Sequence, residues 1–332
     1  MPDHPVATPT EESAGASDVP GRRTGWVGTA RRVLGGRTVR YAFVAVAVGL
    51  GAYAVVRQWH DVRTSLVDIG ILPALGALVA VLAGLAFSVQ VWRVLLASLG
   101  SPLPIRAAAK VVFVGQLGKY LPGAIWPVLA QMELGTAHKV PRARSATASM
   151  LTMIVSLLGG LIAALVTLPF MAGEATAYRW AFLAAPVLLA CVHPKVLNPL
   201  LDRLLRLARR PPMTQPLTGR AVLLALGWAM VSWVLYGAQI WLLAVRLGAP
   251  DGRTVLLAIG GFAFAWCVGF LIVFAPAGAG IREVLLVALL GPVVGVGGAT
   301  AVALVSRILM TLGDLVMAAV AAWSGRHAPA TD

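Results

Sequence analysis

The segment Ala221–Val245, AVLLALGWAMVSWVLYGAQIWLLAV, runs for 25 residues without a charged side chain. A helix needs roughly 20 apolar residues to cross the hydrocarbon core of a bilayer. Lipid cannot satisfy an open backbone N–H or C=O group, so a spanning segment of this kind must be helical. The segment therefore predicts a transmembrane α-helix.

Apolar runs of the same character recur on both sides of this segment. The whole chain of 332 residues is 59% hydrophobic and only 12% charged, whereas soluble domains average about 25% charged residues. We therefore expect an all-α polytopic membrane protein. The other runs are Tyr41–Val56, Ile71–Trp92, Ala146–Met171, Ala181–Val192, Thr254–Ala275 and Gly295–Trp323.

The ends of the chain have a different composition. Residues 1–38 are rich in Pro, Thr, Ser, Gly and Arg, which predicts a disordered cytoplasmic tail. A cleaved signal peptide would place an apolar segment near the start, and none is present there. We expect the transmembrane domain to cover residues 39–324, followed by a short cytoplasmic tail at residues 325–332.

The net charge of +14 invites a nucleic-acid interpretation, but the basic residues alternate between loops. An excess of Arg and Lys in loops on one side marks the cytoplasmic side of a membrane. We therefore expect a multi-pass plasma-membrane protein with both termini cytoplasmic and no nucleic-acid partner. The basic residues expected inside are Arg22, Arg23, Arg31, Arg32, Arg37, Arg40, Lys139, Arg142, Arg144, Lys195, Arg203, Arg206, Arg209, Arg210, Arg220 and Arg326, and those outside are Arg57, Arg63, Arg179, Arg246 and Arg253.

Two segments, Leu103–Ala137 and Thr254–Val293, are each flanked by loops assigned to one side of the membrane. Each has Pro and Gly near its middle, and these residues break helices. Broken backbone at membrane depth is tolerated where protein or a water-filled cavity surrounds it. The sequence predicts about six full transmembrane helices plus two re-entrant hairpins, with eight or more spans as the alternative.

The two halves also resemble each other. Gln90-Val91-Trp92 and the following Leu99-Gly100 correspond to Gln239-Ile240-Trp241 and the following Leu247-Gly248. Each copy then leads through a polar loop and an apolar helix to a Pro/Gly break. The expected topology gives the copies opposite directions, as in the inverted repeats of secondary transporters, which bind substrate near the midplane. Chance similarity between Leu/Ala/Val-rich helices is the alternative.

Charged residues near the two breaks are the candidates for a site. Each costs at least ~2.5–3.5 kcal/mol at the bilayer centre, so such residues face an interior and usually serve a function. Lys119, Arg282 and Arg307 would attract a phosphate, aided by free N–H groups of the helix after Gly280. The candidate substrate-path residues are Lys119, Tyr120, Pro122, Gly123, Trp126, Glu133, Pro276, Gly278, Gly280, Arg282, Glu283, Arg307 and Asp314.

A structural role for these charges is compatible with the first. In that interpretation Arg282 pairs with Glu133, or Arg307 pairs with Asp314, which lies seven residues further along the same helical face. No Ser/His/Asp set and no metal-ligand spacing accompanies them. We expect no catalytic residues, no metal and no cofactor, and the two cysteines, Cys191 and Cys267, to be small buried hydrophobic residues.

Two motifs carry a resemblance to a known family: Gly118-Lys119-Tyr120-Leu121-Pro122-Gly123 with Trp126, and Pro276-Ala277-Gly278-Ala279-Gly280-Ile281-Arg282-Glu283. The chain resembles the flippase-like membrane domain of lysylphosphatidylglycerol synthases over roughly Val39–Ser324. The resemblance implies translocation of an aminoacylated phospholipid between leaflets. The chain departs from the family at Ala277, where a Gly is usual, and at Gln131, where relatives often carry Arg. It ends nine residues after Trp323, so we do not expect the family's aminoacyl transfer.

Three functions follow from these observations. The first is a carrier for a phospholipid or lipid-linked molecule, with membrane lipids of anionic headgroup as partners. The second is an accessory or scaffold subunit that works with cell-envelope biosynthesis enzymes. The third is a membrane-embedded enzyme acting on a lipid headgroup. Charges beside both breaks favour the carrier, because a scaffold would not need them. The sequence leaves the cargo, the energy source and the oligomeric state open.

Overall fold

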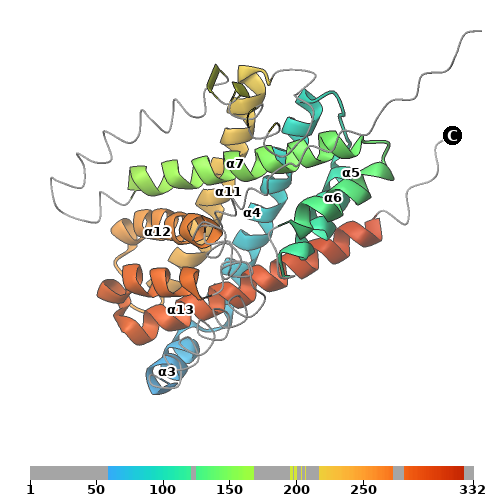
Figure 1. Ribbon diagram of the computed structural model, residues 1–332. Helices are drawn as coiled ribbons and strands as arrows, with labels where there is room; N and C mark the ends of the chain where they lie inside the picture. Colours follow the sequence, from blue (N-terminus) through green and yellow to red (C-terminus); the bar gives the residue numbers. More distant parts are fainter. Residues whose placement is uncertain are drawn as a thin grey trace, which may run out of the picture. The chain divides into compact units, whose positions relative to one another are not determined.

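The computed structural model describes residues 59–120, 125–167, 217–271 and 280–324, with isolated residues between 195 and 206. These residues are almost entirely helical (Figure 1). The expected tails at residues 1–38 and 325–332, and the apolar runs Tyr41–Val56 and Ala181–Val192, lie outside the described residues. The elements are α3 (Trp59–Ile69), α4 (Ile71–Ser98), α5 (Ile105–Ala109), the π-helical turn η1 (Lys110–Val114), the 3-10 turn η2 (Leu117–Tyr120), α6 (Trp126–Thr136), α7 (Arg142–Thr167), α11 (Gly219–Val245), α12 (Asp251–Leu271) and α13 (Ile281–Ser324).

Five of the described helices are long and apolar enough to cross a membrane: α4, α7, α11, α12 and α13. Helices α4, α11 and α13 contain the whole of the runs Ile71–Trp92, Ala221–Val245 and Gly295–Trp323, and α7 and α12 contain the described part of theirs. The expected class, an all-α polytopic membrane protein, is confirmed. The number of full spans in the whole chain stays a prediction.

Helices α4 and α11 form an antiparallel pair. Gly76 of α4 lies beside Leu242 of α11, whereas Gly84 lies beside Tyr236, so residue numbers rise along one helix as they fall along the other. A Cβ atom at Gly84 would come within 2.5 Å of the Tyr236 ring. Small residues allow helices in lipid to approach this closely, because dispersion contacts replace the hydrophobic driving force. Figure 1 shows this pair with α7 crossing it.

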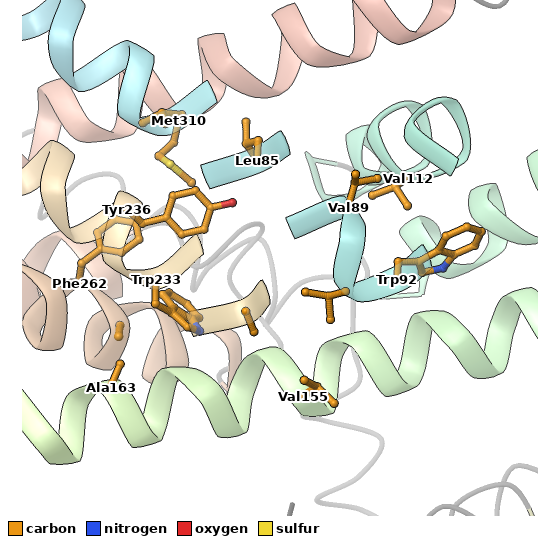
Figure 2. Close-up of a cluster of buried hydrophobic side chains, with 14 of the residues drawn as sticks. Leu85, Val89, Trp92, Val112, Val155, Ala163, Trp233, Tyr236, Phe262 and Met310 are labelled. Atoms are coloured by element: carbon orange, nitrogen blue, oxygen red, sulfur yellow. The ribbon is translucent and has the colours of Figure 1, made fainter. Parts of the chain in front are cut away.

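Aromatic side chains fill the space between α11 and α12. Trp233 and Tyr236 of α11 both contact Phe262 of α12, with ring centroids 6.4 Å and 6.0 Å away. Figure 2 shows these rings together, while Trp92 lies at the other end of the same apolar core. Trp233 and Tyr236 themselves meet edge to face, one of the favoured geometries for aromatic pairs. The core thus fixes α12 against α11, and Phe262 reappears below because a charged residue lies on it.

The first predicted hairpin is a series of short helical pieces. Residues 105–120 pass from α5 through a π-helical turn to a 3-10 turn, and α6 follows with only 11 residues. Both arms are shorter than the roughly 20 residues that a full span requires. The arms touch through backbone, since a Cβ atom at Gly118 would lie 2.9 Å from the nitrogen of Pro127. The position of this hairpin in the membrane stays a prediction.

The second predicted hairpin contains a helix that is long enough to span. Helix α12 has 21 residues, equivalent to about 31 Å. Helix α13 bends at Gly295, whose φ of 73° and ψ of 161° are non-helical, so a first arm of residues 281–294 precedes a second arm of residues 296–324. The re-entrant form of this second hairpin stays a prediction.

The two segments identified as a repeat end in the same local structure. The N–H of Ser101 donates to the carbonyl of Leu96, and the N–H of Ala249 donates to the carbonyl of Ala244. In each case a glycine with positive φ, Gly100 or Gly248, lies in the turn. This is the Schellman motif, which ends helices with a left-handed residue. The antiparallel α4 and α11 have the directions that an inverted repeat requires, and the repeat itself stays a prediction.

Candidate functional site

Asp314 is the acceptor for two side chains of the first hairpin. The Nζ atom of Lys119 lies 2.6 Å from Asp314 Oδ2, and the hydroxyl of Tyr120 donates to the same oxygen at 2.6 Å. Asp314 is buried in the second arm of α13, while Lys119 and Tyr120 belong to the 3-10 turn η2. A buried carboxylate needs such partners, because an unpaired charge in an apolar interior is costly. This contact therefore ties residues from two distant parts of the sequence.

Glu283 joins the two arms of α13. Its Oε2 atom accepts the backbone N–H of Gly280 at 2.7 Å, and its Oε1 atom lies 3.0 Å from Nη1 of Arg307. Gly280 is the residue before the helix and Glu283 is the third residue within it, so the first contact is half of a capping box. The N–H of Gly280 is consequently occupied by the protein's own carboxylate. The expectation that the first N–H groups of the helix itself are free for an anion stays a prediction.

Arg282 has no ionic partner among the described residues. It is buried, with 6% of its surface exposed, and its Nε atom has no hydrogen-bond partner. Its guanidinium lies over the ring of Phe262, with Cζ 5.3 Å from the ring centroid. It is near enough to Glu283, Arg307 and Asp314 to sense their charges. Arg282 therefore belongs to the same cluster without sharing its ion pairs.

Both pairings suggested by the sequence are wrong. Glu133 pairs with Arg142 at 2.8 Å, and both side chains are exposed, so Glu133 does not reach Arg282. Arg307 and Asp314 form no ion pair with each other in the described structure, because each is engaged by a different segment. The spacing of seven residues placed them on one helical face, but it did not indicate which segments pack against that face.

The other candidate residues are less informative. Trp126 begins α6 next to Gly118 and is partly exposed. Gly280 has a φ of 86°, a left-handed conformation that glycine adopts without strain, and it precedes α13. Pro122, Gly123, Pro276 and Gly278 lie outside the described residues. The structure thus brings together six candidates, which we call the charged cluster: Lys119, Tyr120, Arg282, Glu283, Arg307 and Asp314.

Gln131 has a structural place in the described chain. Its side-chain oxygen accepts the hydroxyl of Ser149, which in turn accepts the indole N–H of Trp92 at 3.2 Å. This buried chain of hydrogen bonds joins α6, α7 and α4. Sequence reasoning missed Phe262, the ring beneath Arg282, because nothing distinguishes it from other aromatic residues in an apolar run. Within the described ranges, no three His, Cys, Asp or Glu side chains gather closely enough to hold a metal ion.

Apolar helices that enclose paired charges define a polytopic membrane protein with a polar interior site. The family described as the lysylphosphatidylglycerol synthase TM region matches residues 41–318, and the chain belongs to this family. The match confirms the resemblance carried by the two motifs around Lys119 and Arg282. A search of curated proteins found no match.

Proposed function

We propose that this protein is a carrier that moves a phospholipid or lipid-linked molecule between the leaflets of the plasma membrane. One observation carries the proposal: four members of the charged cluster lie in the apolar helix α13, where one ion pair joins its two arms and another joins its second arm to the first hairpin. A structural protein could fill the same space with apolar side chains. Charges kept in the interior of membrane helices usually mark a path for a polar substrate.

The position of Arg307 along α13 supports this proposal. Arg307 lies 12 residues beyond the bend at Gly295, about 18 Å along a helix. Since the hydrocarbon core is about 30 Å thick, a second arm that starts at one interface would place Arg307 near the midplane. A headgroup crossing at this depth would leave water unless it met polar partners there. The charged cluster provides them.

The two ion pairs can open by exchanging a carboxylate for an anionic headgroup. An anionic headgroup entering the cluster would compete with Asp314 for Lys119 and with Glu283 for Arg307. Each cation would then exchange a carboxylate for the anion of the headgroup, so neither cation would become unpaired during the crossing. Because one pair reaches the first hairpin and the other reaches the first arm of α13, this exchange would also loosen contacts between segments.

The proposed carrier has a defined orientation in the membrane and catalyses no reaction. We place both termini in the cytoplasm, because the loops expected there carry most of the Arg and Lys residues. Membrane lipids are the partners, and the protein provides no chemical step. An accessory role beside cell-envelope biosynthesis enzymes is the function to which a negative transport result would lead.

Reconstituted protein tests the proposal. Purified protein in liposomes with fluorescent phospholipids in one leaflet is expected to speed leaflet exchange over empty liposomes. Arg307→Gln should slow exchange about tenfold or more, the effect of losing a hydrogen bond between charged groups. The readout is dithionite quenching of the probe that remains in the outer leaflet.

Arg142→Gln is the matched control, because it also removes an arginine from an ion pair, but an exposed one. It should leave exchange unchanged. Exchange equal to that of empty liposomes for every lipid class would overturn the carrier and favour the accessory role. Headgroup turnover without exchange would instead identify an enzyme.

A further inference from the structure

The charges of the cluster do not balance. Lys119 pairs with Asp314, and Arg307 pairs with Glu283. Arg282 is the remaining cation, and its guanidinium lies over the Phe262 ring instead of pairing with a carboxylate. Among the described residues the cluster therefore carries three positive charges and two negative ones, and the excess positive charge lies on Arg282.

The Phe262 ring does not compensate for this charge. A cation over an aromatic ring gains a modest stabilisation even when it is desolvated. The loss of hydration on burial is larger, and a buried guanidinium normally recovers it through hydrogen bonds with an anion. Arg282 has no such bond on Nε and is 94% buried, since 6% of its surface is exposed. Its planar fork of N–H groups is suited to two oxygens of one phosphate.

The carboxylates of the cluster are already engaged. Glu283 uses both oxygens, one for Arg307 and one for the N–H of Gly280. Asp314 receives both Lys119 and Tyr120 on Oδ2. An ammonium group in a headgroup would need a carboxylate of its own, and would have to displace one of these contacts. The cluster therefore disfavours a headgroup that carries a cation beside its phosphate.

We propose that Arg282 is the binding site for the phosphodiester of a lipid whose headgroup carries one net negative charge and no ammonium group. This inference rests on the proposed carrier function and specifies its substrate class. The bound phosphodiester supplies the charge that the cluster lacks. Zwitterionic lipids, aminoacylated lipids and lipids without phosphate are poor substrates.

The test compares three fluorescent lipids in the reconstituted system: phosphatidylglycerol, phosphatidylcholine and the phosphate-free glucosylceramide. Phosphatidylglycerol is expected to exchange about tenfold faster than glucosylceramide, the effect of one additional hydrogen bond to a charged group. It should also exchange faster than phosphatidylcholine, because its net negative charge neutralises the excess positive charge of the cluster and that of a zwitterion does not. Arg282→Gln should abolish this preference, and Arg282→Lys should keep part of it. Arg142→Gln should keep all of it. Equal rates for the three lipids, or a preference that survives in Arg282→Gln, overturn the inference but leave the carrier function intact.

A binding measurement covers the case in which no lipid is exchanged. Dihexanoyl phosphatidylglycerol, added to protein in a neutral detergent, should raise the melting temperature of the wild type more than dihexanoyl phosphatidylcholine does. The difference should vanish in Arg282→Gln. Without either lipid, Arg282→Gln should melt at or above the wild-type temperature, because it removes a buried charge without a partner. Equal shifts by the two lipids, or an unliganded variant that melts well below the wild type, assign Arg282 a structural role.

Discussion

Asp314 is the residue of the charged cluster on which two partner side chains converge. One of its oxygens receives both the ammonium of Lys119 and the hydroxyl of Tyr120. Lys119 is about a third exposed at 29%, whereas the Asp314 side chain is only 5% exposed. Asp314 therefore depends on Lys119 for its stabilisation more than Lys119 depends on Asp314. The carboxylate has little access to water, while the ammonium keeps some.

Asp314→Asn is expected to lower the melting temperature of the protein in detergent. The substitution leaves Lys119 without an anion, and breaking a buried ion pair in this way costs about 3–5 kcal/mol when both partners are buried. Partial exposure of Lys119 should reduce that loss. Differential scanning fluorimetry on intrinsic tryptophan measures it.

Lys119→Met should restore part of the stability in the Asp314→Asn background, because the unpaired cation is then gone. In the wild-type background the same substitution should destabilise. A double variant whose loss equals the sum of the two single losses would show that the residues do not interact.

The sequence indicated which charged residues belong to the cluster, but it did not indicate which of them form ion pairs with each other. The cost of a charge in lipid identified Lys119, Arg282, Glu283, Arg307 and Asp314, and all five belong to the charged cluster. Which cation meets which carboxylate depends on how separate segments pack, and helical periodicity describes only one segment. Glu133 was included for its place near a break, but it lies on an exposed face with Arg142.

The bend in α13 is the element on which the arrangement of the site depends. Gly295 separates the arm that carries Arg282 and Glu283 from the arm that carries Arg307 and Asp314. Its φ of 73° with ψ of 161° is a region that residues with a side chain rarely adopt. No atom lies within 4 Å of the position that a Cβ would occupy. A substitution there would meet backbone strain without a steric clash.

Gly295→Ala is expected to destabilise the protein by about 1–3 kcal/mol, the cost of holding a residue in such a region. Gly291→Ala, in the helical first arm, is the matched control. Its Cβ would lie 3.9 Å from Val296, an ordinary contact, so it should stabilise by about 0.5–1 kcal/mol. Melting temperatures of the two variants measure the contrast. Similar shifts in both would mean that the bend is not held at Gly295.

Helices were predictable where the apolar run was long and uninterrupted. The runs in α4, α7, α11 and α12 begin within four residues of the helix starts, and the start of the last run coincides with the bend at Gly295. The first hairpin was predicted only as a broken segment. Its division into α5, a π-helical turn and a 3-10 turn depends on contacts such as the one between Gly118 and Pro127, which no local pattern reveals.

At the scale of the whole molecule, two contacts fix which loops share an end. Nη1 of Arg144 donates to the carbonyl of Gly100 at 3.0 Å, so the start of α7 lies beside the end of α4. Because α4 and α11 are antiparallel, the end of α11 lies at the opposite end of the pair. Lys139, just before α7, and Arg253, in the first turn of α12, therefore lie toward opposite ends of the α4–α11 pair.

A membrane-impermeant maleimide tests this arrangement together with the proposed orientation. In a background with Cys191 and Cys267 replaced by Ala, Arg253→Cys should be labelled on intact cells and Lys139→Cys only after permeabilisation. The physical reason is the excess of basic residues in the loops assigned to the cytoplasm. Labelling of both positions from one side would contradict the structure, and a reversed pattern would contradict only the orientation.

The contact between Gly84 and Tyr236 also limits how this molecule can move. The Tyr236 ring fills the space that a side chain at position 84 would need. Helices α4 and α11 therefore cannot slide past each other by a helical turn without first separating. Packed interfaces of this kind change in discrete steps rather than by gradual deformation. Any alternation between two sides of the membrane must therefore be borne by the other helix contacts. The α4–α11 pair would then serve as the fixed frame against which their displacements could be measured.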